Sequence, residues 1–320
     1  MTSISADTAR VYSYLGPAGT FTEQALKQVA EAEGQIWKPV LNVSQALADV
    51  TDGTSNAAMI AIENSLDGGV TATQDALAKT DNLQILGEYL VPVNFVLVSR
   101  RNVSRDEITT IAAHPVAYAQ CRAWLEKNLP KHRHIPATSN AQAAVDLFGT
   151  NAVANAAIAP PTITEHYNLT VHATDLAGDL SATTRFVLVG PRQPAGEPSG
   201  HDKTSLIVDL PDDRAGALLT LLEQFAAHGV NLTQIASRPT GSVMGSYRFY
   251  IDAEGHIREE RVRYAVLGLK LHSPNVRFLG SYARADKIAP STDVHHSDAA
   301  FKAAKQWLND VVSGVSEAGD

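Results

Sequence analysis

The chain has 320 residues, of which 44% are hydrophobic, and this length predicts two or three domains rather than one. Its formal net charge of −8 argues against a general nucleic-acid-binding protein, because a phosphate backbone requires a basic face. The single cysteine excludes an intrachain disulfide, residues 1–10 lack the apolar segment of a secretory signal, and no apolar run could cross a bilayer. We therefore expect a cytoplasmic protein with no membrane association.

The first 192 residues alternate between strand-like and helix-like segments. Strand patterns occupy residues 11–15, 37–40, 57–63, 83–98 (a long extended stretch), 111–113, 134–137, 154–158 and 184–189. Helix patterns occupy residues 20–32, 43–52, 70–79, 117–128 and 141–148. This alternation predicts mainly parallel sheets covered by helices, in two lobes with a cleft between them, the second lobe covering roughly residues 99–180. Ligands of such folds bind where strands end and helices begin.

A second domain follows a linker. Residues 193–203 (QPAGEPSGHDK) are rich in Pro and Gly and predict a linker. Beyond it, strand patterns at 204–210, 231–238, 246–252 and 276–280 alternate with helix patterns at 214–228 and 257–272. The order βαββαβ predicts a ferredoxin-like domain over residues 204–285. Residues 286–320 form a tail with a predicted helix at 297–312, and the chain shows no internal repeat.

Polar side chains follow two strands of the first lobe. In YLGPAGTFTEQAL, a Gly/Pro turn leads into a helix start, where Thr20 and Glu23 have the spacing of a capping box. The free N–H groups at such a helix start can also bind an anion. In AIENSLDGGV, the side chains of Glu63, Asn64 and Ser65 come directly after a buried strand. An ordinary turn is the alternative explanation for both motifs.

The second lobe offers similar candidates. In HPVAYAQC, Pro115 suits a first helical position, His114 precedes it and Gln120 lies along the helix. His114 can donate a hydrogen bond to a carboxylate, and Ser139 precedes the next helix; helix capping explains both equally well. Cys121 has no histidine partner in the sequence, so we expect it to pack in a core.

TTRFVLVG contains the most informative charge. Arg185 lies in or beside a strand that is otherwise apolar, and a cation there requires an anionic partner. That partner is either a protein carboxylate or a substrate carboxylate held by the guanidinium fork. Thr184 and Arg185 point to opposite faces of a regular strand, so both line one site only near a strand end or a bulge. The sequence contains no P-loop, dinucleotide fingerprint or metal-ligand pattern, and we expect no cofactor and no metal.

Taken in this order, the motifs resemble the prephenate dehydratase family. YLGPAGTFTEQAL, IENSLDGG, HPVAYAQC and TTRF are followed by GALLTLL, GVNLTQIASRP and FLGSYARA, so that the resemblance covers nearly all of residues 11–285. It implies an α/β fold with a two-lobed, periplasmic-binding-protein-like catalytic region over residues 1–192. It also implies that residues 204–285 form an ACT domain, a ferredoxin-like module that binds amino acids, often at a subunit interface.

The resemblance also implies an activity and a site. The family converts prephenate to phenylpyruvate, with loss of carbon dioxide and water, and needs no cofactor. Thr184 is implied as the catalytic donor to the departing hydroxyl, with Arg185 as the carboxylate anchor. The implied substrate-binding residues are Thr20, Phe21, Asn64, Ser65, His114, Gln120, Ser139 and Phe186. The implied phenylalanine-binding residues are Gly216, Ala217, Leu218, Asn231, Ser237, Arg238 and Pro239.

One departure and two alternatives accompany this interpretation. The regulatory motif of the family reads Glu-Ser-Arg-Pro, whereas Ala236 occupies the Glu position here. Arogenate, the aminated analogue of prephenate, is an alternative substrate, and a non-catalytic amino-acid sensor is an alternative function. By resemblance we expect a homodimer or homotetramer with contacts through the ACT domain, and regulation by phenylalanine.

Overall fold

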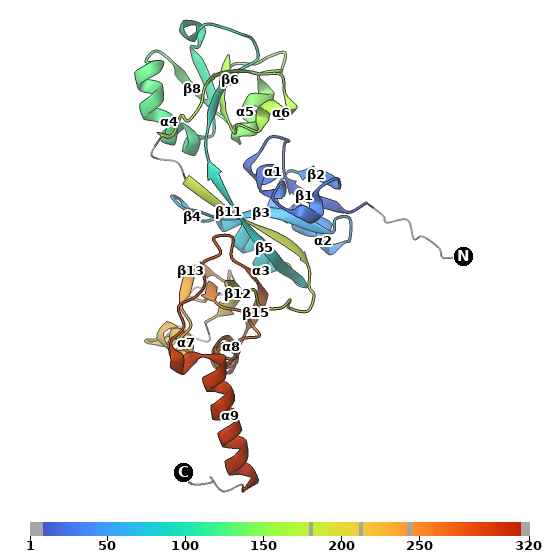
Figure 1. Cartoon of the computed structure of the whole chain (residues 1–320). Helices are drawn as coiled ribbons and strands as arrows, with labels where there is room; N and C mark the ends of the chain where they lie inside the picture. The colour runs from blue at the N-terminus through green and yellow to red at the C-terminus, as the bar shows by residue number, and fades with distance from the viewer. Residues whose placement is uncertain (1–8, 179–181, 211–213, 242–244, 315–320) are drawn as a thin grey trace, which may run out of the picture. The chain divides into compact units, whose positions relative to one another are not determined.

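The computed structural model describes residues 9–178, 182–210, 214–241 and 245–314 (Figure 1). The chain divides into two compact units. The first consists of Met1–Asn82 and Tyr89–Pro191, and the second of Leu83–Glu88 and Arg192–Asp320. Both contain sheets and helices, as the sequence predicts.

The first unit contains two sheets, and each forms one lobe. The sheet of the first lobe has the order β2-β1-β3-β11-β5, with β4 paired to β3. Its strands are β1 (Val11–Leu15), β2 (Ile36–Val40), β3 (Ala57–Asn64), β4 (Gly68–Gly69), β5 (Leu83–Val93) and β11 (Ala182–Pro191). Its helices are α1 (Phe21–Leu26), α2 (Val43–Thr51) and α3 (Thr71–Lys79).

The sheet of the second lobe has the order β10-β6-β9-β7-β8. Its strands are β6 (Val96–Ser99), β7 (Thr110–Ala113), β8 (Arg133–Pro136), β9 (Ala156–Ala159) and β10 (Thr170–Ala173). Its helices are α4 (Pro115–Asn128), α5 (Asn140–Asp146) and α6 (Ile163–His166). Along β7, Ile111 belongs to the same apolar cluster as Cys121 of α4, whereas Ala112 belongs to the cluster of Ala141 and Ala144 of α5. Helices therefore cover both faces of this sheet, which explains why its inner strands β6 and β9 are buried along their whole length (Figure 1).

Two expectations about the first unit were wrong, and the structure refines a third. The sheets are mixed rather than mainly parallel, because β3–β11, β6–β9 and β6–β10 are antiparallel. The helix predicted for residues 20–32 ends at Leu26 and is followed by a 3₁₀ turn at Ala30–Ala32. Side chains of two strands hold that turn, since Trp37 Nε1 of β2 donates to the Ala32 carbonyl oxygen at 2.8 Å and the Tyr12 hydroxyl of β1 donates to that of Glu31 at 3.1 Å. The extended stretch at 83–98 is two strands, since the chain leaves β5 after Val93 and enters the other sheet at Val96.

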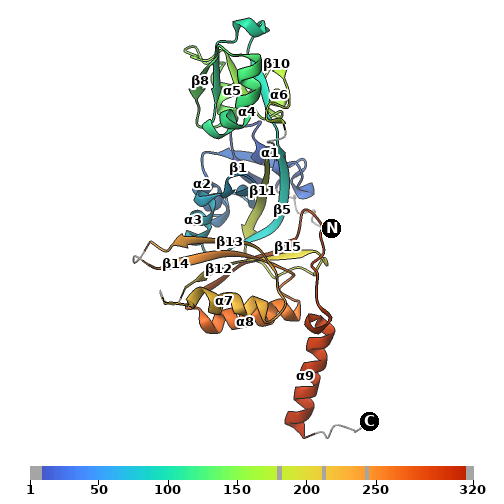
Figure 2. The ribbon, with the colours of Figure 1, turned by 90° about the vertical axis from the view of Figure 1, so that its left-hand side faces the viewer.

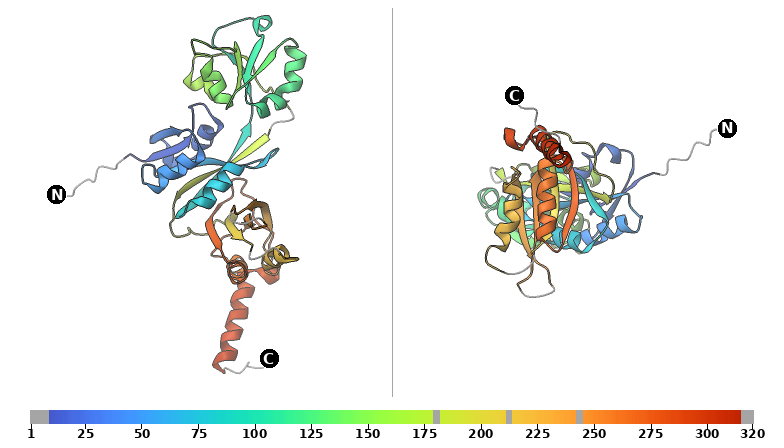
Figure 3. Two further views of the ribbon diagram at one scale, coloured as in Figure 1. Left: turned by 180° about the vertical axis from the view of Figure 1, so that it is seen from behind. Right: turned by 90° about the horizontal axis from the view of Figure 1, so that it is seen from below.

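The second unit is built on an antiparallel sheet with the order β13-β14-β12-β15. Its elements are β12 (Asp202–Asp209), α7 (Ala217–Ala226), β13 (Leu232–Pro239), β14 (Tyr247–Glu254), α8 (Glu260–His272) and β15 (Val276–Ala283), in the expected order βαββαβ. Helices α7 and α8 lie side by side on one face of the sheet (Figures 2 and 3). Leu206 and Val208 of β12 pack against Phe225 of α7 and Val262 of α8. The helix predicted from residue 214 begins at Ala217, because Gly216 has φ = 83° and is its N-cap.

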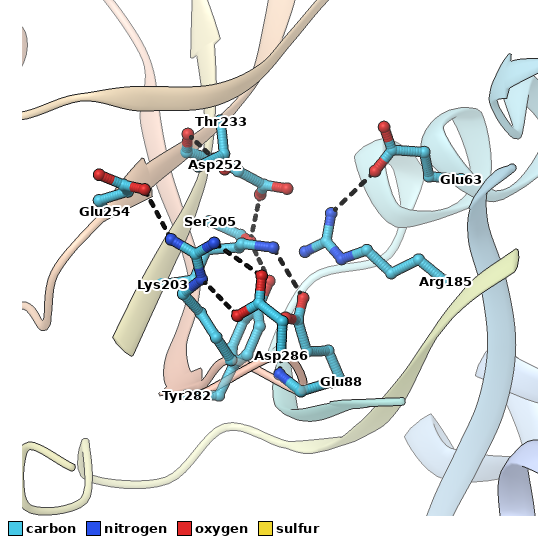
Figure 4. Close-up of polar contacts among 12 residues, drawn as sticks. Glu63, Glu88, Arg185, Lys203, Ser205, Thr233, Asp252, Glu254, Tyr282 and Asp286 are labelled. Carbon is cyan, nitrogen blue, oxygen red and sulfur yellow. Dashed lines mark hydrogen bonds and ion pairs between the residues drawn. The ribbon is translucent and has the colours of Figure 1, made fainter. Parts of the chain in front are cut away.

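Buried charges lie among the polar residues of β12. Lys203 donates to Glu88 at 2.9 Å, and both side chains are almost completely buried. Ser205 donates to Asp252 at 2.5 Å (Figure 4). Arg284 contacts Glu254 and Asp286 at 2.6 and 2.7 Å. Buried charges are tolerated only when they are paired in this way, and the Lys203–Glu88 pair fixes the segment Leu83–Glu88 in the second unit.

The tail ends in α9 (Asp298–Ser313), close to the helix predicted at 297–312. Ser297 caps it, and Phe301 stacks on Tyr264 of α8 with ring centroids 5.3 Å apart. Lys305 donates to Glu260 at 2.6 Å, which is a second contact with α8. Within the ranges given above, no helix combines the length and the apolar character that a membrane span requires.

The contact between Gly280 and the segment Leu83–Glu88 yields a stability prediction. Gly280 has φ = 140°, and a Cβ there would lie 2.4 Å from the carbonyl oxygen of Ile85. We expect Gly280→Ala to lower the free energy of unfolding by about 3 kcal/mol, measured by denaturant titration. Gly200→Ala is the matched control, because Gly200 has φ = 86° but no atom lies within 4 Å of the added Cβ. It should cost about 1 kcal/mol. Equal losses for both variants would contradict this packing.

Candidate active site

A cavity of about 280 Å³ lies between the two lobes of the first unit. The first lobe contributes Thr20, Phe21, Thr184 and Phe186 to its wall, and the second lobe contributes His114 and Ser139. The structure thus brings together six of the ten residues that the sequence predicts for catalysis and substrate binding. A larger cavity of about 620 Å³ lies beside α5 in the second lobe and contains none of the ten, so it is the smaller one that we treat as the active site.

The pairing of β3 with β11 forms the floor of the site. Thr184 is opposite Asn64 and Arg185 is opposite Glu63, but Phe186 is opposite Ala61. One extra residue of β3 therefore forms a bulge, which the sequence did not reveal. Residues 61 and 64 of β3 are three positions apart and would point to opposite faces of a regular strand. The bulge lets both serve the same site: residue 61 lines the cavity, and Asn64 bonds to Thr184.

The orientation of Asn64 determines the hydrogen bond of Thr184. The side-chain oxygen of Asn64 accepts the backbone N–H groups of Leu66 and Asp67 at 2.9 and 3.2 Å. The amide nitrogen of Asn64 consequently faces Thr184 and donates to its Oγ1 at 2.9 Å. Since this bond occupies Oγ1 as an acceptor, the hydroxyl proton of Thr184 is left to donate to another group. Thr184 lines the cavity and is only 9% exposed.

Ser65 holds the backbone next to Thr184. Its N–H donates to the carbonyl oxygen of Thr183 at 2.9 Å, and its Oγ accepts the N–H of Thr183 at the same distance. Ser65 does not line the cavity. Both of its contacts are with the backbone of Thr183, and they fix the position of the neighbouring Thr184.

Arg185 points away from Thr184. It is 6% exposed and does not line the cavity, and its guanidinium contacts Glu63 Oε2 at 3.4 Å (Figure 4). The bulge lies on β3 and leaves β11 regular, so adjacent β11 residues still face opposite sides. Of the two partners considered from the sequence, the structure therefore shows a protein carboxylate, at a distance long for a charged hydrogen bond.

The turn before α1 closes one side of the cavity. Thr20 caps the helix by accepting the N–H of Glu23 at 3.3 Å and donates its own hydroxyl to the carbonyl oxygen of Leu15 at 2.9 Å. Glu23 in turn accepts the N–H of Gly19 at 2.5 Å. These bonds resemble the predicted capping box but are shifted by one residue, and they use N–H groups that the sequence left available for an anion. Glu23 itself is a residue whose importance the spacing alone did not reveal.

The wall from the second lobe consists of helix caps. His114 Nδ1 accepts the N–H of Val116 at 3.3 Å, and Ser139 accepts the N–H of Gln142 at 3.0 Å. The side chain of Asn140 accepts the N–H of His114 at 2.9 Å, which joins the starts of α4 and α5. Both predicted roles coincide here, because His114 and Ser139 cap helices and also face the cavity.

Two residues on α4 lie outside the cavity. Gln120 does not line it, and its side-chain oxygen is buried without a partner in the part of the chain that the structure describes. Cys121 is buried in the core of the second lobe, as expected, and burial raises the pKa of its thiol to about 12. The thiol therefore stays protonated at neutral pH. Among the described residues, no three His, Cys, Asp or Glu side chains gather as ligands for a metal ion.

Known proteins resemble this chain along nearly its whole length. A sequence model of the family Prephenate dehydratase matches residues 12–194, and a model of the ACT domain matches residues 204–263. The chain belongs to the prephenate dehydratase family. A protein from Corynebacterium glutamicum called Prephenate dehydratase is 40% identical over 313 residues, which cover 94% of this chain and 98% of that protein. Another of that name, from Amycolatopsis methanolica, is 41% identical over 305 residues, with coverages of 94% and 98%.

A solved structure extends the comparison to three dimensions. The crystal structure of a prephenate dehydratase from Arthrobacter aurescens, in complex with L-Phe, has a TM-score of 0.91 and 47% identity to this chain. The match covers 95% of this chain and 99% of that one. These findings confirm the expected family, the α/β catalytic region and the ACT domain.

The predicted effector residues of this prephenate dehydratase family member lie at two edges of the ACT sheet. Gly216, Ala217 and Leu218 form the start of α7, in the connection that follows β12. Through β14, the end of β12 at Asp209 is in register with Arg238 at the end of β13, so Ser237 and Pro239 lie at the same edge. Asn231 precedes β13 and lies at the opposite edge, about 25 Å away along the eight-residue strand. One copy of the chain therefore does not bring all seven residues together.

Proposed function

We propose that this protein is a prephenate dehydratase that phenylalanine regulates through the ACT domain. The observation that carries the proposal is the hydrogen bond from Asn64 to Thr184, which leaves the Thr184 proton available inside a cavity. It occurs in a chain whose relatives, at about 40% identity, are called prephenate dehydratase.

The chemistry needs a proton donor and anion recognition. The bond between the ring and its carboxylate breaks, and its electron pair completes the aromatic ring as the opposite C–O bond breaks. The departing hydroxide takes a proton and leaves as water, and the products are phenylpyruvate and carbon dioxide. No electrons are gained or lost overall, so the reaction requires no redox partner. Negative charge develops on the departing oxygen, and a fixed donor stabilises it there.

Thr184 is the proposed donor. A threonine hydroxyl is a weak acid in water, but an oriented donor in a largely buried site stabilises developing charge more strongly than water does. Asn64 contributes by donating to Oγ1, because this directs the hydroxyl proton away from Asn64. Hydrogen bonds in such a chain also polarise one another, which makes Thr184 a better donor.

Arg185 is the proposed carboxylate anchor, with His114 and Ser139 as further donors from the second lobe. Prephenate is a dianion, and a guanidinium fork is the side chain best suited to hold a carboxylate. Arg185 follows Thr184 directly, and its contact with Glu63 is long at 3.4 Å. Because Arg185 faces away from the cavity in this structure, we propose that its guanidinium leaves Glu63 and turns toward a substrate carboxylate when substrate binds. Thr20, Phe21, Asn64, Ser65, Gln120 and Phe186 remain the proposed substrate-binding residues, and Asn64, Ser65 and Gln120 lie outside the cavity wall.

The second unit supports the regulatory half of the proposal. We propose residues 1–192 as the catalytic region, 193–203 as the linker, 204–285 as the effector domain and 286–320 as a tail. The relative from Arthrobacter aurescens was crystallised with L-Phe. Because Asn231 lies at the edge of the sheet opposite Ser237–Pro239, a second copy of the chain is needed to complete the effector site, in a homodimer or homotetramer. Ala236, opposite Tyr250, leaves the site without the family carboxylate.

The proposed compartment is the cytoplasm. The lone thiol, Cys121, is buried and protonated, so it is protected from oxidation and suited to a reducing environment.

The test of the function is phenylpyruvate formation from prephenate by the purified protein. We expect turnover that phenylalanine suppresses, and we expect Thr184→Ala to reduce turnover at least about a hundredfold without loss of fold. Circular dichroism serves as the folding control. Near-normal turnover by folded Thr184→Ala would remove Thr184 from its role. Turnover of arogenate in preference to prephenate would correct the substrate, and no turnover of either would favour a sensor.

The Asn64 variants separate orientation from simple contact. Asn64→Ala removes the donor to Oγ1 and should lower kcat about tenfold. Asn64→Asp should lower it further, about a hundredfold, because a carboxylate accepts the Thr184 proton and adds negative charge beside a dianion. Steady-state kinetics of the two variants give the comparison. If Asn64→Asp retained more activity than Asn64→Ala, Asn64 would not act by directing the Thr184 proton.

Arg185→Lys distinguishes an anchor from a structural ion pair. Lysine keeps the charge but not the fork, so we expect KM for prephenate to rise about tenfold to a hundredfold. Glu63→Gln is the matched control, because it removes the protein partner and leaves the guanidinium intact. It should leave KM unchanged or lower it. If both variants raised KM equally, the pair with Glu63, and not a substrate carboxylate, would account for the effect of Arg185.

A further inference from the structure

A buried carboxylate of the first lobe has partners in both lobes. The side chain of Glu23 is only 3% exposed. Its Oε2 accepts the N–H of Gly19, in the turn beside the cavity, at 2.5 Å. Its Oε1 lies 2.6 Å from Nε2 of His166 in α6 of the second lobe. An ionised carboxylate only accepts, so His166 is the donor of this bond.

Other contacts join the same two pieces of chain. Thr162, just before α6, donates its hydroxyl to the carbonyl oxygen of Gly19 at 3.0 Å. A Cβ on Gly19 would lie 2.7 Å from the side chain of Ile163, so only a glycine lets α6 approach this closely. Lys27 and Glu165 form an ion pair between α1 and α6, but their side chains are 34% and 54% exposed.

The contact with Glu23 dominates among these polar contacts, because the Glu23 carboxylate is buried although the His166 side chain is 35% exposed. An exposed ion pair such as Lys27–Glu165 contributes little, because water screens it. A buried carboxylate without its donor is strongly unfavourable. The negative charge of Glu23 affects a neighbouring side chain. The pKa of Tyr14 is raised to about 12, mainly by burial, with smaller contributions from the charges of Glu23 and Tyr167. Tyr167 also contacts the pair directly, since its ring centroid lies 6.5 Å from that of His166. Lys27 and Glu165 are the neighbouring charged groups, from the end of α1 and from α6.

We propose that Glu23 and His166 are positioning residues that hold the two lobes at the spacing required to bind substrate. We call this hydrogen-bonded pair the inter-lobe latch. On one side it fixes the turn of Gly19 and Thr20, and on the other it fixes α6. The cavity wall contains Thr20 and Phe21 from one lobe and His114 and Ser139 from the other, so their separation depends on the latch.

The latch acts on binding rather than on bond breaking. Neither Glu23 nor His166 lines the cavity, so neither touches the reacting atoms. Without the latch, a smaller fraction of molecules has both walls at the binding distance, and apparent affinity falls by that fraction. Once substrate bridges the lobes, the same donors surround it, and kcat is preserved. The expected rise in KM rests on the proposed function, whereas the role of the latch in holding the lobes together does not.

The kinetic test compares three variants of the full chain. His166→Ala should raise KM for prephenate about tenfold and leave kcat within about twofold. His166→Gln should restore KM, because the glutamine amide places an N–H donor near the position of Nε2. Lys27→Met, which removes the exposed pair between the same two helices, should leave both constants unchanged. An unchanged KM for His166→Ala, or a lowered kcat not rescued by His166→Gln, would overturn the proposal.

Hydrogen exchange tests the latch independently of any substrate. His166→Ala should speed exchange of the backbone amides in peptides covering residues 15–23 and 160–167, and Lys27→Met should not. Unchanged exchange in both peptides would overturn the latch even if turnover changed. Faster exchange in a protein that turns over no prephenate would keep the latch and refute the proposed function instead.

Discussion

The pairing of β3 with β11 holds Asn64 and Thr184 within hydrogen-bonding distance although they are 120 positions apart in the sequence. Because side chains alternate along a strand, a slip of one residue would turn Thr184 to the opposite face and Arg185 toward the cavity. Two bonds between Ser65 and Thr183 resist such a slip at the end of the strands. The bulge in β3 then adjusts the partner strand, so that the donor to Thr184 comes from the correct side. The orientation of the Thr184 hydroxyl is thus set by the register between β3 and β11.

In the other walls of the cavity, single polar side chains have two roles. His114 and Ser139 satisfy helix N-termini and face the cavity, and Thr20 does both in the first lobe. A side chain held by a cap has little conformational freedom left to lose when a ligand arrives. The starts of α1, α4 and α5 therefore provide rigid walls, and the relative placement of the lobes is the adjustable quantity. That placement depends on a few contacts of α6 with the turn at Gly19.

Periodicity and motif order predicted most of the elements, the βαββαβ unit and six residues of the cavity wall. Amphipathic segments such as α2 and α7 have signals strong enough to survive tertiary context. Helix α6 and strands β4 and β10 are too short for any period, and none of them was predicted. The sequence does not decide between the two partners of Arg185, because the strand order and the bulge are set by long-range pairing. Glu23 was seen only as a capping residue, since its partner is 143 positions away.

Strand β5 has a consequence for how this protein can be divided. Its first six residues belong to the unit that contains the ACT domain, and the rest belong to the catalytic unit. A fragment starting after residue 192 would lack Glu88, the ion-pair partner of Lys203. It would also expose the surface around Gly280 that Ile85 covers. The ACT domain of this chain could therefore not be transferred intact to another protein by recombination, because part of its packing comes from residues Leu83–Glu88, which lie within the catalytic sequence.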